Sequence, residues 1–397
     1  MPAMRYKRFE EEIDEVIREQ EWKKLRASGT LIEHLSNLTD PRVERTKRHL
    51  LVDIVVIGIC AVICGSDTWA GMEEYGMAKY EWLKGFLELP NGIPSHDTFG
   101  RVFSRLSAEE FRESFLGWIN AVNEITGGQV VAIDGKTLRR SFDKASDKAA
   151  IHMVSAWAEA NRLVLGQVKV DEKSNEITAI PKLLNMLDLS GCLVTIDAMG
   201  CQKEISKLII KKEADYVLAL KGNHGNLYED VKFFFDDALT NGFGEFKYKY
   251  HETIDKGHGR IEVRRYWMVS DINWLDEKNQ WKGLRSIGMV ESERIMGEET
   301  TTEKRYYISS LTGDAQKFAY GVRGHWAIEN SLHWVLDVAF REDESRIRKG
   351  NGAENFALLR HIALNLLKQE RSSKVGVKIK RNKAGWDNDY LLKVLFG

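Results

Sequence analysis

The stretch Gly128–Arg140, GQVVAIDGKTLRR, decides the fold, because a β-branched apolar run ends there in Asp134 and is followed by glycine. A second stretch, Gly191–Gly200 (GCLVTIDAMG), repeats this pattern with Asp197. Each stretch predicts a buried strand that presents a carboxylate at its carboxyl-terminal edge. In α/β sheets this is the edge that carries ligand-binding groups.

Strands and helices alternate on both sides of these two stretches. From Gly127 to Lys221 the expected order is strand, strand, strand, helix, strand, helix, strand. This is the order of a ribonuclease H-like core, in which the first and fourth strands carry acids, as Asp134 and Asp197 do here. The predicted fold class is therefore α/β, with a ribonuclease H-like mixed-sheet catalytic core.

The sequence patterns before and after this core predict the remaining domain organisation. Residues 10–26 are highly charged with helical spacing and predict an N-terminal arm. Helical patterns up to residue 125 are compatible with a DNA-reading module and with a plain helical bundle. We predict four segments: an α-helical N-terminal, DNA-binding domain (1–126), the first part of the core (127–243), a β-rich insertion (244–311), and a last segment (312–397). The last segment completes the core with a helix that carries a candidate catalytic glutamate, Glu329, and ends in a basic C-terminal tail.

A third carboxylate comes from the helical stretch Val322–Trp334, VRGHWAIENSLHW, which contains Glu329. Carboxylates from two strands and a helix could hold a pair of Mg²⁺ ions, which prefer hard oxygen ligands. Two such ions, about 3.5–4 Å apart, support phosphoryl transfer. Asp134 and Asp197 are 63 residues apart, and Glu329 follows 132 residues later, a gap that suits a core with an insertion. Spacing leaves other downstream acids open as alternatives: Asp337, Glu342, Asp343 and Glu344.

Composition indicates an ordinary globular protein. The chain has 397 residues, is 43% hydrophobic and 29% charged, and carries a net charge of −1. Its four cysteines form no CxxC pair, which disfavours a zinc site and fits a reduced cytoplasmic compartment. The start of the chain has no apolar signal region, and the apolar run Leu50–Gly65 is too short for a membrane span and contains Asp53. We expect that run to form a buried helix.

Basic residues gather near the C-terminus. Between Leu366 and Lys383 seven Lys and Arg face a single acid, Glu370. The pattern fits a solvated basic tail and a phosphate-contacting arm equally well. The seven are Lys368, Arg371, Lys374, Lys378, Lys380, Arg381 and Lys383.

Several motifs together resemble one family. The segments AIDGKTLRRS, TIDAMGCQKEI, YVLALKGNHG, HGRIEVRRYWMV and RGHWAIENSLHWVLDVAF are similar to those of bacterial insertion-sequence transposases of the DDE type. The chain resembles in particular the subgroup that includes the H-repeat-associated proteins, from about Leu31 to about Lys368. The resemblance implies that Asp134, Asp197 and Glu329 are the catalytic metal ligands, with Mg²⁺ as cofactor and Mn²⁺ able to substitute.

The chain departs from the broader group around the glutamate. Where that group has Tyr, Arg and Lys at set distances, this chain has Val322, His325 and Leu336, with Tyr320 and Arg323 slightly out of register. Further residues are expected to contact DNA, although a surface or core role fits each as well. They are Lys136 and Arg139 beside Asp134, Lys221 at a strand end, His258, Arg260 and Arg264 in a basic turn, and Arg323 and His325 before Glu329. Trp326 and Trp334 are expected in the core rather than as base-stacking platforms.

Together these features predict a DNA transposase that nicks transposon ends and joins the freed 3′ hydroxyl to target DNA. The resemblance implies inverted-repeat and target DNA as partners and a homodimer on paired ends. Two rivals stay open, a nuclease on the same core that only hydrolyses DNA and an inactive transposon-derived DNA-binding protein. We expect a cytoplasmic protein that does not bind membranes.

Overall fold

The computed structural model describes residues 30–122, 128–142, 149–171, 174–257 and 259–396. The expected helical arm over residues 10–26 lies outside these ranges. The chain divides into two compact units, each described by itself. The helical unit comprises Met1–Asn123, Thr137–Ile151 and Trp334–Gly397, and the sheet unit comprises Glu124–Lys136 and His152–His333. The four segment boundaries expected from the sequence stay a prediction.

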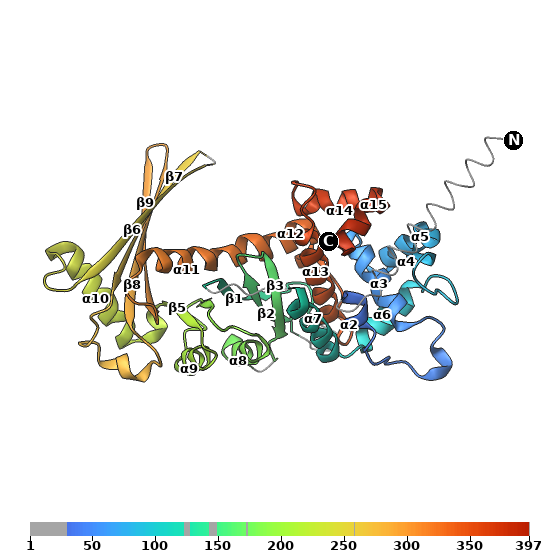
Figure 1. Cartoon of the computed structure of the whole chain (residues 1–397), viewed down its shortest axis with the longest axis horizontal. Helices are drawn as coiled ribbons and strands as arrows, with labels where there is room; N and C mark the ends of the chain where they lie inside the picture. The colour runs from blue at the N-terminus through green and yellow to red at the C-terminus, as the bar shows by residue number, and fades with distance from the viewer. Residues whose placement is uncertain (1–29, 123–127, 143–148, 172–173, 258, 397) are drawn as a thin grey trace. The chain divides into compact units, whose positions relative to one another are not determined.

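The helical unit is built from short and medium α-helices that come before and after the sheet unit along the chain (Figure 1). Its helices are α2 (Leu31–Leu35), α3 (Leu51–Ile63), α4 (Trp69–Ala78), α5 (Tyr80–Lys84), α6 (His96–Arg105), α7 (Ala108–Val122), α12 (Trp334–Phe340), α13 (Gly352–Gln369), α14 (Val377–Trp386) and α15 (Asn388–Phe396). The short 3₁₀ turns η1 (Glu44–Thr46) and η5 (Glu342–Glu344) also belong to it.

The apolar run near residue 50 forms the buried helix α3, as expected, and Asp53 within it is buried. The Asp53 carboxylate accepts a hydrogen bond from the backbone N–H of Leu89 at 3.0 Å, which compensates for its burial. Trp69 joins the N-terminal and C-terminal parts of this unit, since its ring stacks on Phe103 and meets Phe356 edge-on. In the part of the chain that the structure describes, no helix is long and apolar enough to cross a membrane.

The basic stretch near the C-terminus is folded rather than a free tail. It continues past α13 into α14, where Lys380 and Arg381 are buried. The Lys380 ammonium donates to the carbonyl oxygen of Leu367 at 2.9 Å, and the Arg381 guanidinium donates to the carbonyl oxygen of Val62 at 2.8 Å. For these two residues, both expected roles are wrong, because their donors satisfy buried backbone carbonyls of the helical unit.

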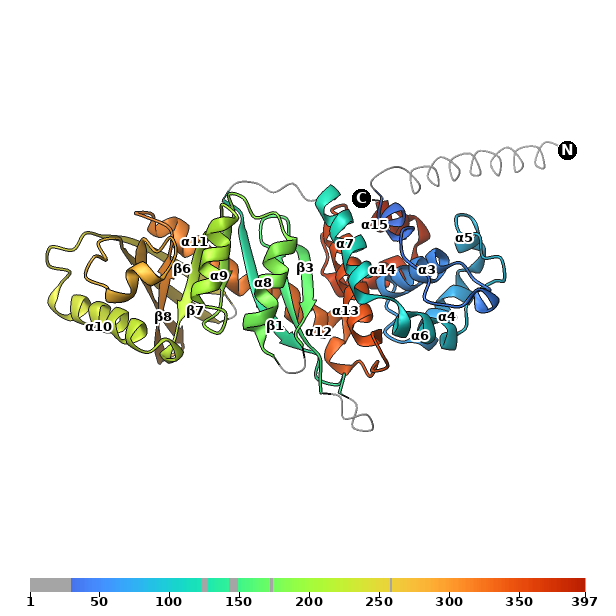
Figure 2. The same ribbon diagram turned by 90° about the horizontal axis from the view of Figure 1, so that it is seen from below.

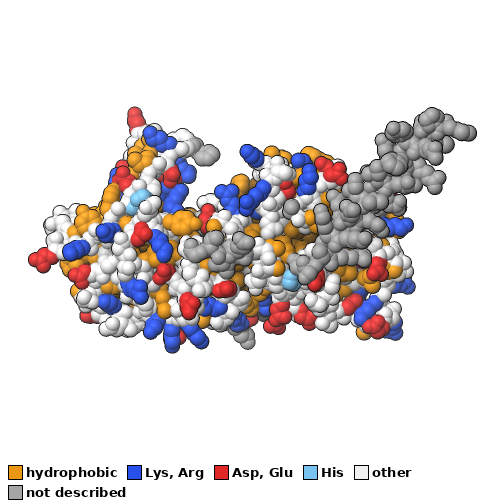
Figure 3. All heavy atoms as spheres, viewed as in Figure 1, with side chains coloured by type: hydrophobic (Ala, Val, Ile, Leu, Met, Phe, Trp, Pro, Cys, Tyr) orange, Lys and Arg blue, Asp and Glu red, His pale blue; other side chains and the backbone are white. Residues whose placement is uncertain are grey.

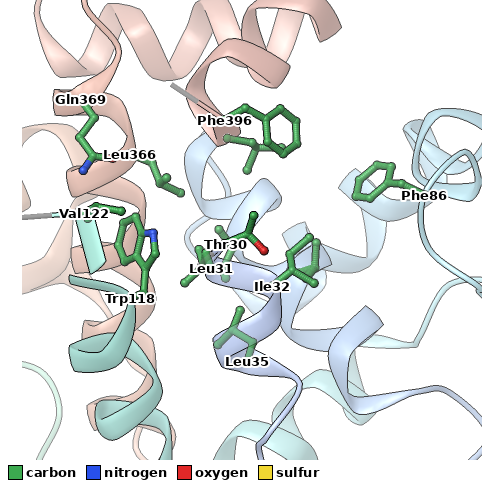
Figure 4. Close-up of a pocket in the computed structure, with 13 residues that line it drawn as sticks. Thr30, Leu31, Ile32, Leu35, Phe86, Trp118, Val122, Leu366, Gln369 and Phe396 are labelled. Carbon is green, nitrogen blue, oxygen red and sulfur yellow. The ribbon is translucent and has the colours of Figure 1, made fainter. Parts of the chain in front are cut away.

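The helical unit also contains an apolar cavity of about 250 Å³. Trp118 and Val122 of α7 face Leu31 and Leu35 of α2 across it, and Phe396 of α15 also lines it (Figure 4).

The sheet unit contains one nine-stranded mixed sheet in the order β3-β2-β1-β4-β5-β9-β8-β7-β6. The strands are β1 (Val130–Thr137), β2 (His152–Ala158), β3 (Leu163–Lys169), β4 (Leu193–Ile196), β5 (Asp215–Leu220), β6 (Tyr248–Gly257), β7 (Arg260–Val269), β8 (Ser286–Met296) and β9 (Glu299–Ser309). Its helices are α8 (Glu176–Met186), α9 (Lys203–Lys211), α10 (Asn226–Asn241) and α11 (Ala315–Ile328), with 3₁₀ turns at Gly222–His224 and Asp276–Gln280 and a π-helical turn at Glu329–His333.

The first five strands follow the order expected from the sequence. β1 pairs with β4 and β4 with β5 in parallel, whereas β2 and β3 form an antiparallel pair. The residues Val130–Ile133 and β4 are buried throughout, because helices cover both faces of the sheet (Figures 1 and 2). α11 lies on one face, and α8 and α9 lie on the other.

The β-rich segment extends this same sheet. β9 pairs antiparallel with β5, from Val217 opposite Ser309 to Leu220 opposite Tyr306. β8, β7 and β6 then follow as antiparallel neighbours. One continuous sheet therefore joins the region of the two aspartates to the long outer hairpins.

Two glycines let α11 pack closely on the central strands. A Cβ at Gly324 would lie 2.6 Å from Cγ1 of Val130 in β1, and a Cβ at Gly321 would lie 2.8 Å from Cδ2 of Leu193 in β4. The same helix buries Phe318 in the apolar core of the sheet. Close packing on β1 and β4 carries the end of α11 toward the ends of the strands that bear the aspartates.

Candidate active site

The strand register places the two aspartates next to each other. Ile133 pairs with Ile196 as the last matched pair of β1 and β4, so Asp134 and Asp197 are the next residues on adjacent parallel strands. Neighbouring strands lie about 4.8 Å apart. Asp197 directly follows β4, as expected, whereas Asp134 lies within β1, which continues to Thr137.

The turn after β4 fixes the Asp197 carboxylate. Its Oδ1 accepts hydrogen bonds from the backbone N–H groups of Met199 at 3.0 Å and Gly200 at 3.1 Å. Gly200 is needed there, since a Cβ would lie 2.3 Å from Cγ2 of Ile196. The small residues after the aspartate thus let the chain turn back over its own strand.

Glu329 begins the π-helical turn Glu329–His333 at the end of α11. π-turns inside helices occur frequently at functional sites. Glu329, Asp134 and Asp197 all line one cavity of about 300 Å³. The structure therefore brings the three acids expected from the sequence to a single cavity, although they come from three separate elements.

The cavity raises the pKa of two of these acids. Burial raises the pKa of Asp134 to about 7; the backbone N–H of Gly135 opposes this, and the charges of Asp197, Glu176 and Glu329 add to it. Burial also raises the pKa of Glu329, and Asp197 adds to this while Arg305 and Lys221 oppose it. Crowding of negative charge at one place is the condition that a bound cation relieves.

Two histidines accompany the acids. His325 Nδ1 lies 3.4 Å from Oγ1 of Thr195 on β4, and burial lowers the pKa of His325, so its ring is neutral at pH 7. His333 Nδ1 lies 3.5 Å from Oδ2 of Asp134. His325 lines the cavity, in keeping with its expected place beside the glutamate.

Three cationic residues also line the cavity, Lys221, Lys304 and Arg305, and Lys304 is paired with Asp236 at 2.9 Å. Lys221, which directly follows β5, was expected near the site. Arg305 on β9 was not, because it lies in the β-rich segment, far from either aspartate in sequence. Its guanidinium stacks over the ring of Trp326, with Cζ 4.5 Å from the ring centroid, and Glu303 holds it at 2.8 Å. The pairing of β9 with β5 brings Arg305 to this place.

A His–Glu pair behind Asp134 was also missed. His152 Nε2 on β2 lies 2.6 Å from Oε1 of Glu176, the first residue of α8. A Cβ at Gly135 would lie 2.1 Å from that Oε1 and 2.4 Å from that Nε2. The glycine after Asp134 was therefore the available sequence signal, since it leaves room for this pair.

The other predicted DNA-contacting residues lie in different places. Arg260, Arg264 and Arg323 line a second cavity, beside the first. Arg139 belongs to the helical unit, where its Nε lies 3.1 Å from Oδ2 of Asp343. Lys136 lies on β1, two residues beyond Asp134, and His258 lies outside the described residues.

The alternative acids belong to the helical unit rather than to this cavity. Glu342 is buried 3.7 Å from Arg360, and Glu344 pairs with Arg341. Trp334 is 61% exposed, so its expected core position is wrong, because it lies on the outer side of α12.

The chemistry of the donor set fits a divalent cation, since carboxylate oxygens are the ligands that Mg²⁺ and Mn²⁺ prefer. Among the residues described, no three His, Cys, Asp or Glu side chains already form a group that could hold a metal ion. Asp134 and Asp197 are neighbours by register, whereas Glu329 reaches the same cavity from the end of α11.

Comparison with known proteins assigns the family. The model of the "Transposase DDE domain" family matches residues 125–366, and the model named "DDE_Tnp_1-associated" matches residues 32–119. The chain is 46% identical to "Putative transposase YncI" of Escherichia coli O157:H7 over 371 residues, which cover 92% of this chain and 94% of that protein. It is 43% identical to "H repeat-associated putative transposase YhhI" of Escherichia coli K12, over 92% of this chain and 98% of that protein.

Among solved structures, a piggyBac transposase synaptic complex with hairpin DNA matches 93% of this chain and 79% of that chain, with a TM-score of 0.43 and 11% identity. A likeness at that score has no weight in assigning the fold. The two family models and the extent of the similarity to the curated relatives decide the matter: the chain belongs to the family of transposases with this DDE domain, alongside the H repeat-associated proteins.

Proposed function

We propose that this protein is a DNA transposase whose Asp134, Asp197 and Glu329 hold divalent metal for the cutting and joining of DNA. The observation that carries the proposal is the β1–β4 register, which makes the two aspartates neighbours at a cavity that Glu329 also lines. We also propose that β1 to β5 with α8, α9 and α11 are a ribonuclease H-like core. The element order and the strand order β3-β2-β1-β4-β5 support this assignment.

The metal chemistry follows from the ligands. Asp134 and Asp197, with Glu329, would hold two Mg²⁺ ions, with Mn²⁺ able to substitute. When bound there, divalent ions activate an oxygen nucleophile and stabilise the departing oxygen of a phosphodiester. The raised pKa of Asp134 supports this role, since a cation replaces the proton that the carboxyl otherwise retains near pH 7.

The other cavity residues would orient the DNA strand. Lys221 and Arg305 are the cations that face the carboxylates, and they would contact non-bridging phosphate oxygens beside the scissile bond. Neutral His325 would donate or accept a hydrogen bond without adding charge. His333 would hold the Asp134 carboxylate in one orientation.

Water attack would first free a 3′ hydroxyl at the element end, and that hydroxyl would then attack target DNA by the same in-line geometry. The partners proposed are therefore terminal inverted-repeat DNA and target DNA, with two copies of the chain acting on paired ends. Because these substrates are cellular DNA, we propose that the protein acts in the cytoplasm.

The test is a cleavage and joining assay on DNA that carries the terminal sequences flanking the gene. Wild-type protein with Mg²⁺ should nick the ends and produce strand-transfer products. Asp134→Asn, Asp197→Asn and Glu329→Gln should each lose both activities while still binding end DNA. Full cleavage by any of these variants would overturn the site assignment, and nicking without joined products would reduce the activity to hydrolysis.

A further inference from the structure

A second, larger cavity lies beside the carboxylate cavity and belongs to the outer hairpins. It has a volume of about 690 Å³ and is lined by residues of β6 to β9 and of α11. It shares Glu303, Arg305 and Trp326 with the carboxylate cavity. Figure 3 shows Lys and Arg side chains interspersed with acidic ones over these hairpins. The shared residues make the two cavities neighbouring parts of one polar surface.

Three arginines converge on one buried carboxylate in this cavity. Arg260 and Arg264 lie two residues before and after Glu262 on β7, so all three point to the same face of the sheet. Arg294 is the partner of Glu262 on β8. Arg260 Nε lies 2.8 Å from Oε1 of Glu262, Arg294 Nη2 lies 3.3 Å from it, and Arg264 pairs with Oε2.

A second carboxylate connects this group to α11. Asp255 on β6 is the register partner of Glu262, and its Oδ2 lies 2.7 Å from Arg264 and 3.3 Å from Arg323. Four guanidinium groups therefore share two carboxylates. The four arginines and two acids form a cluster with an excess charge of +2, and we name this cluster the arginine site.

Stability does not account for the arginine site. The side chains of Arg294, Arg323 and Arg260 are 50%, 44% and 41% exposed, and ion pairs at that exposure contribute little to stability. Each guanidinium has five N–H donors, so one ion pair uses only part of its capacity. Planar, partly engaged guanidinium groups held at fixed positions suit bidentate contacts with phosphate.

We propose that the arginine site binds consecutive phosphodiester groups of the DNA strand that leads away from the carboxylate cavity. Glu262 pairs with three of the four arginines and offsets part of their positive charge. Arg305, stacked on Trp326, lies at the junction and connects the two cavities. This inference rests on the proposed function for the class of ligand, DNA, but it concerns binding rather than cleavage.

The first test measures DNA binding by Arg294→Gln and Arg260→Gln in the full-length protein. The probe is a fluorescein-labelled duplex containing the element end and its flank, with Ca²⁺ in place of Mg²⁺. Each variant should bind more weakly, and the slope of log K against log salt should fall by roughly one for each phosphate that the variant leaves without its arginine. Arg285→Gln is the matched control, since Arg285 is an exposed arginine of the same unit outside the cavity.

The second test locates the bound phosphates on the DNA. Single neutral methylphosphonates are placed at successive positions of both strands, and wild-type and Arg294→Gln proteins are compared on each duplex. We expect one or two adjacent positions at which the methylphosphonate weakens the wild type but not the variant. Equal weakening of both proteins at every position would overturn the proposal.

Glu262→Gln should change DNA affinity in the opposite direction from the arginine variants. Removing this carboxylate frees three guanidinium groups for phosphate, so DNA binding should tighten and its salt slope should steepen. A purely structural role predicts weaker or unchanged binding. If the wild type does not cleave end DNA, but a methylphosphonate still weakens its binding at a position where it does not weaken binding by Arg294→Gln, the proposed function alone is refuted. If the wild type cleaves normally and both proteins respond alike to every methylphosphonate, the arginine site alone is refuted.

Discussion

Gly324→Ala should misplace Glu329 although it adds only one methyl group. The new Cβ would lie 2.6 Å from Cγ1 and 3.0 Å from Cβ of Val130, a buried β-branched residue of a central strand. Ordinary carbon contacts are about 3.5–4.0 Å. α11 therefore has to move by roughly 1 Å away from β1, because valine has little rotamer freedom with which to yield.

Two opposing effects set the magnitude for stability. Overpacking of a close-packed contact costs about 1–3 kcal/mol. Alanine in a helix interior is favoured over glycine by about 1 kcal/mol. The net loss in the free energy of unfolding should therefore be about 0–2 kcal/mol. The effect on activity should be larger, because a shift of about 1 Å in a catalytic group lowers rates by roughly a hundredfold.

The assay pairs chemical denaturation with single-turnover cleavage of end DNA. Gly321→Ala is a graded comparison, since its Cβ would meet Cδ2 of the more flexible Leu193 at 2.8 Å. Gly100→Ala in α6 is the matched control, because its nearest contact would be 3.3 Å. If Gly324→Ala is about 1 kcal/mol more stable than wild type and cleaves DNA normally, the close packing of α11 does not position Glu329.

Two further outcomes follow from other contacts. Gly135→Ala should separate His152 from Glu176 and reduce cleavage more than end binding, as a parallel cleavage and anisotropy comparison would reveal; equal activity would contradict the need for that pair. Burial opposes ionisation of Glu370, but hydrogen bonds from Ser372 and Tyr390 and the charge of Lys380 outweigh it and lower the pKa of Glu370 to about 2. Its ionised form therefore stabilises the helical unit above about pH 4.5, and this contribution is lost as pH falls toward 2, so Glu370→Gln should flatten acid denaturation curves in that window relative to a Glu→Gln change at an exposed site.

Local patterns predicted the parts of the fold that rest on neighbouring residues. The β-branched runs before Asp134 and Asp197 formed β1 and β4, because burial on both faces of a sheet requires continuous apolar strands. The segment before Glu329 formed the helix α11, with Asp314 as its N-cap. The sequence signals for these elements each lie within about ten consecutive residues.

Contacts between distant segments were not predictable in the same way. The pairing of β5 with β9 brings Arg305 to the carboxylates, but it depends on register between segments about ninety residues apart. Arg381 has the composition of a solvated tail, yet its donors meet buried carbonyls of α3 and α12. A single sequence gives the type of each residue but does not show which distant residue it contacts.

The most direct test of the central claim is the position of Mn²⁺ in crystals of the full-length protein, recorded by anomalous scattering at the manganese edge. We expect a peak between Asp134 and Asp197, with Glu329 closer to them than in the metal-free protein, and loss of that peak in Asp197→Asn. Mn²⁺ bound only elsewhere, or an unchanged peak in the variant, would contradict it.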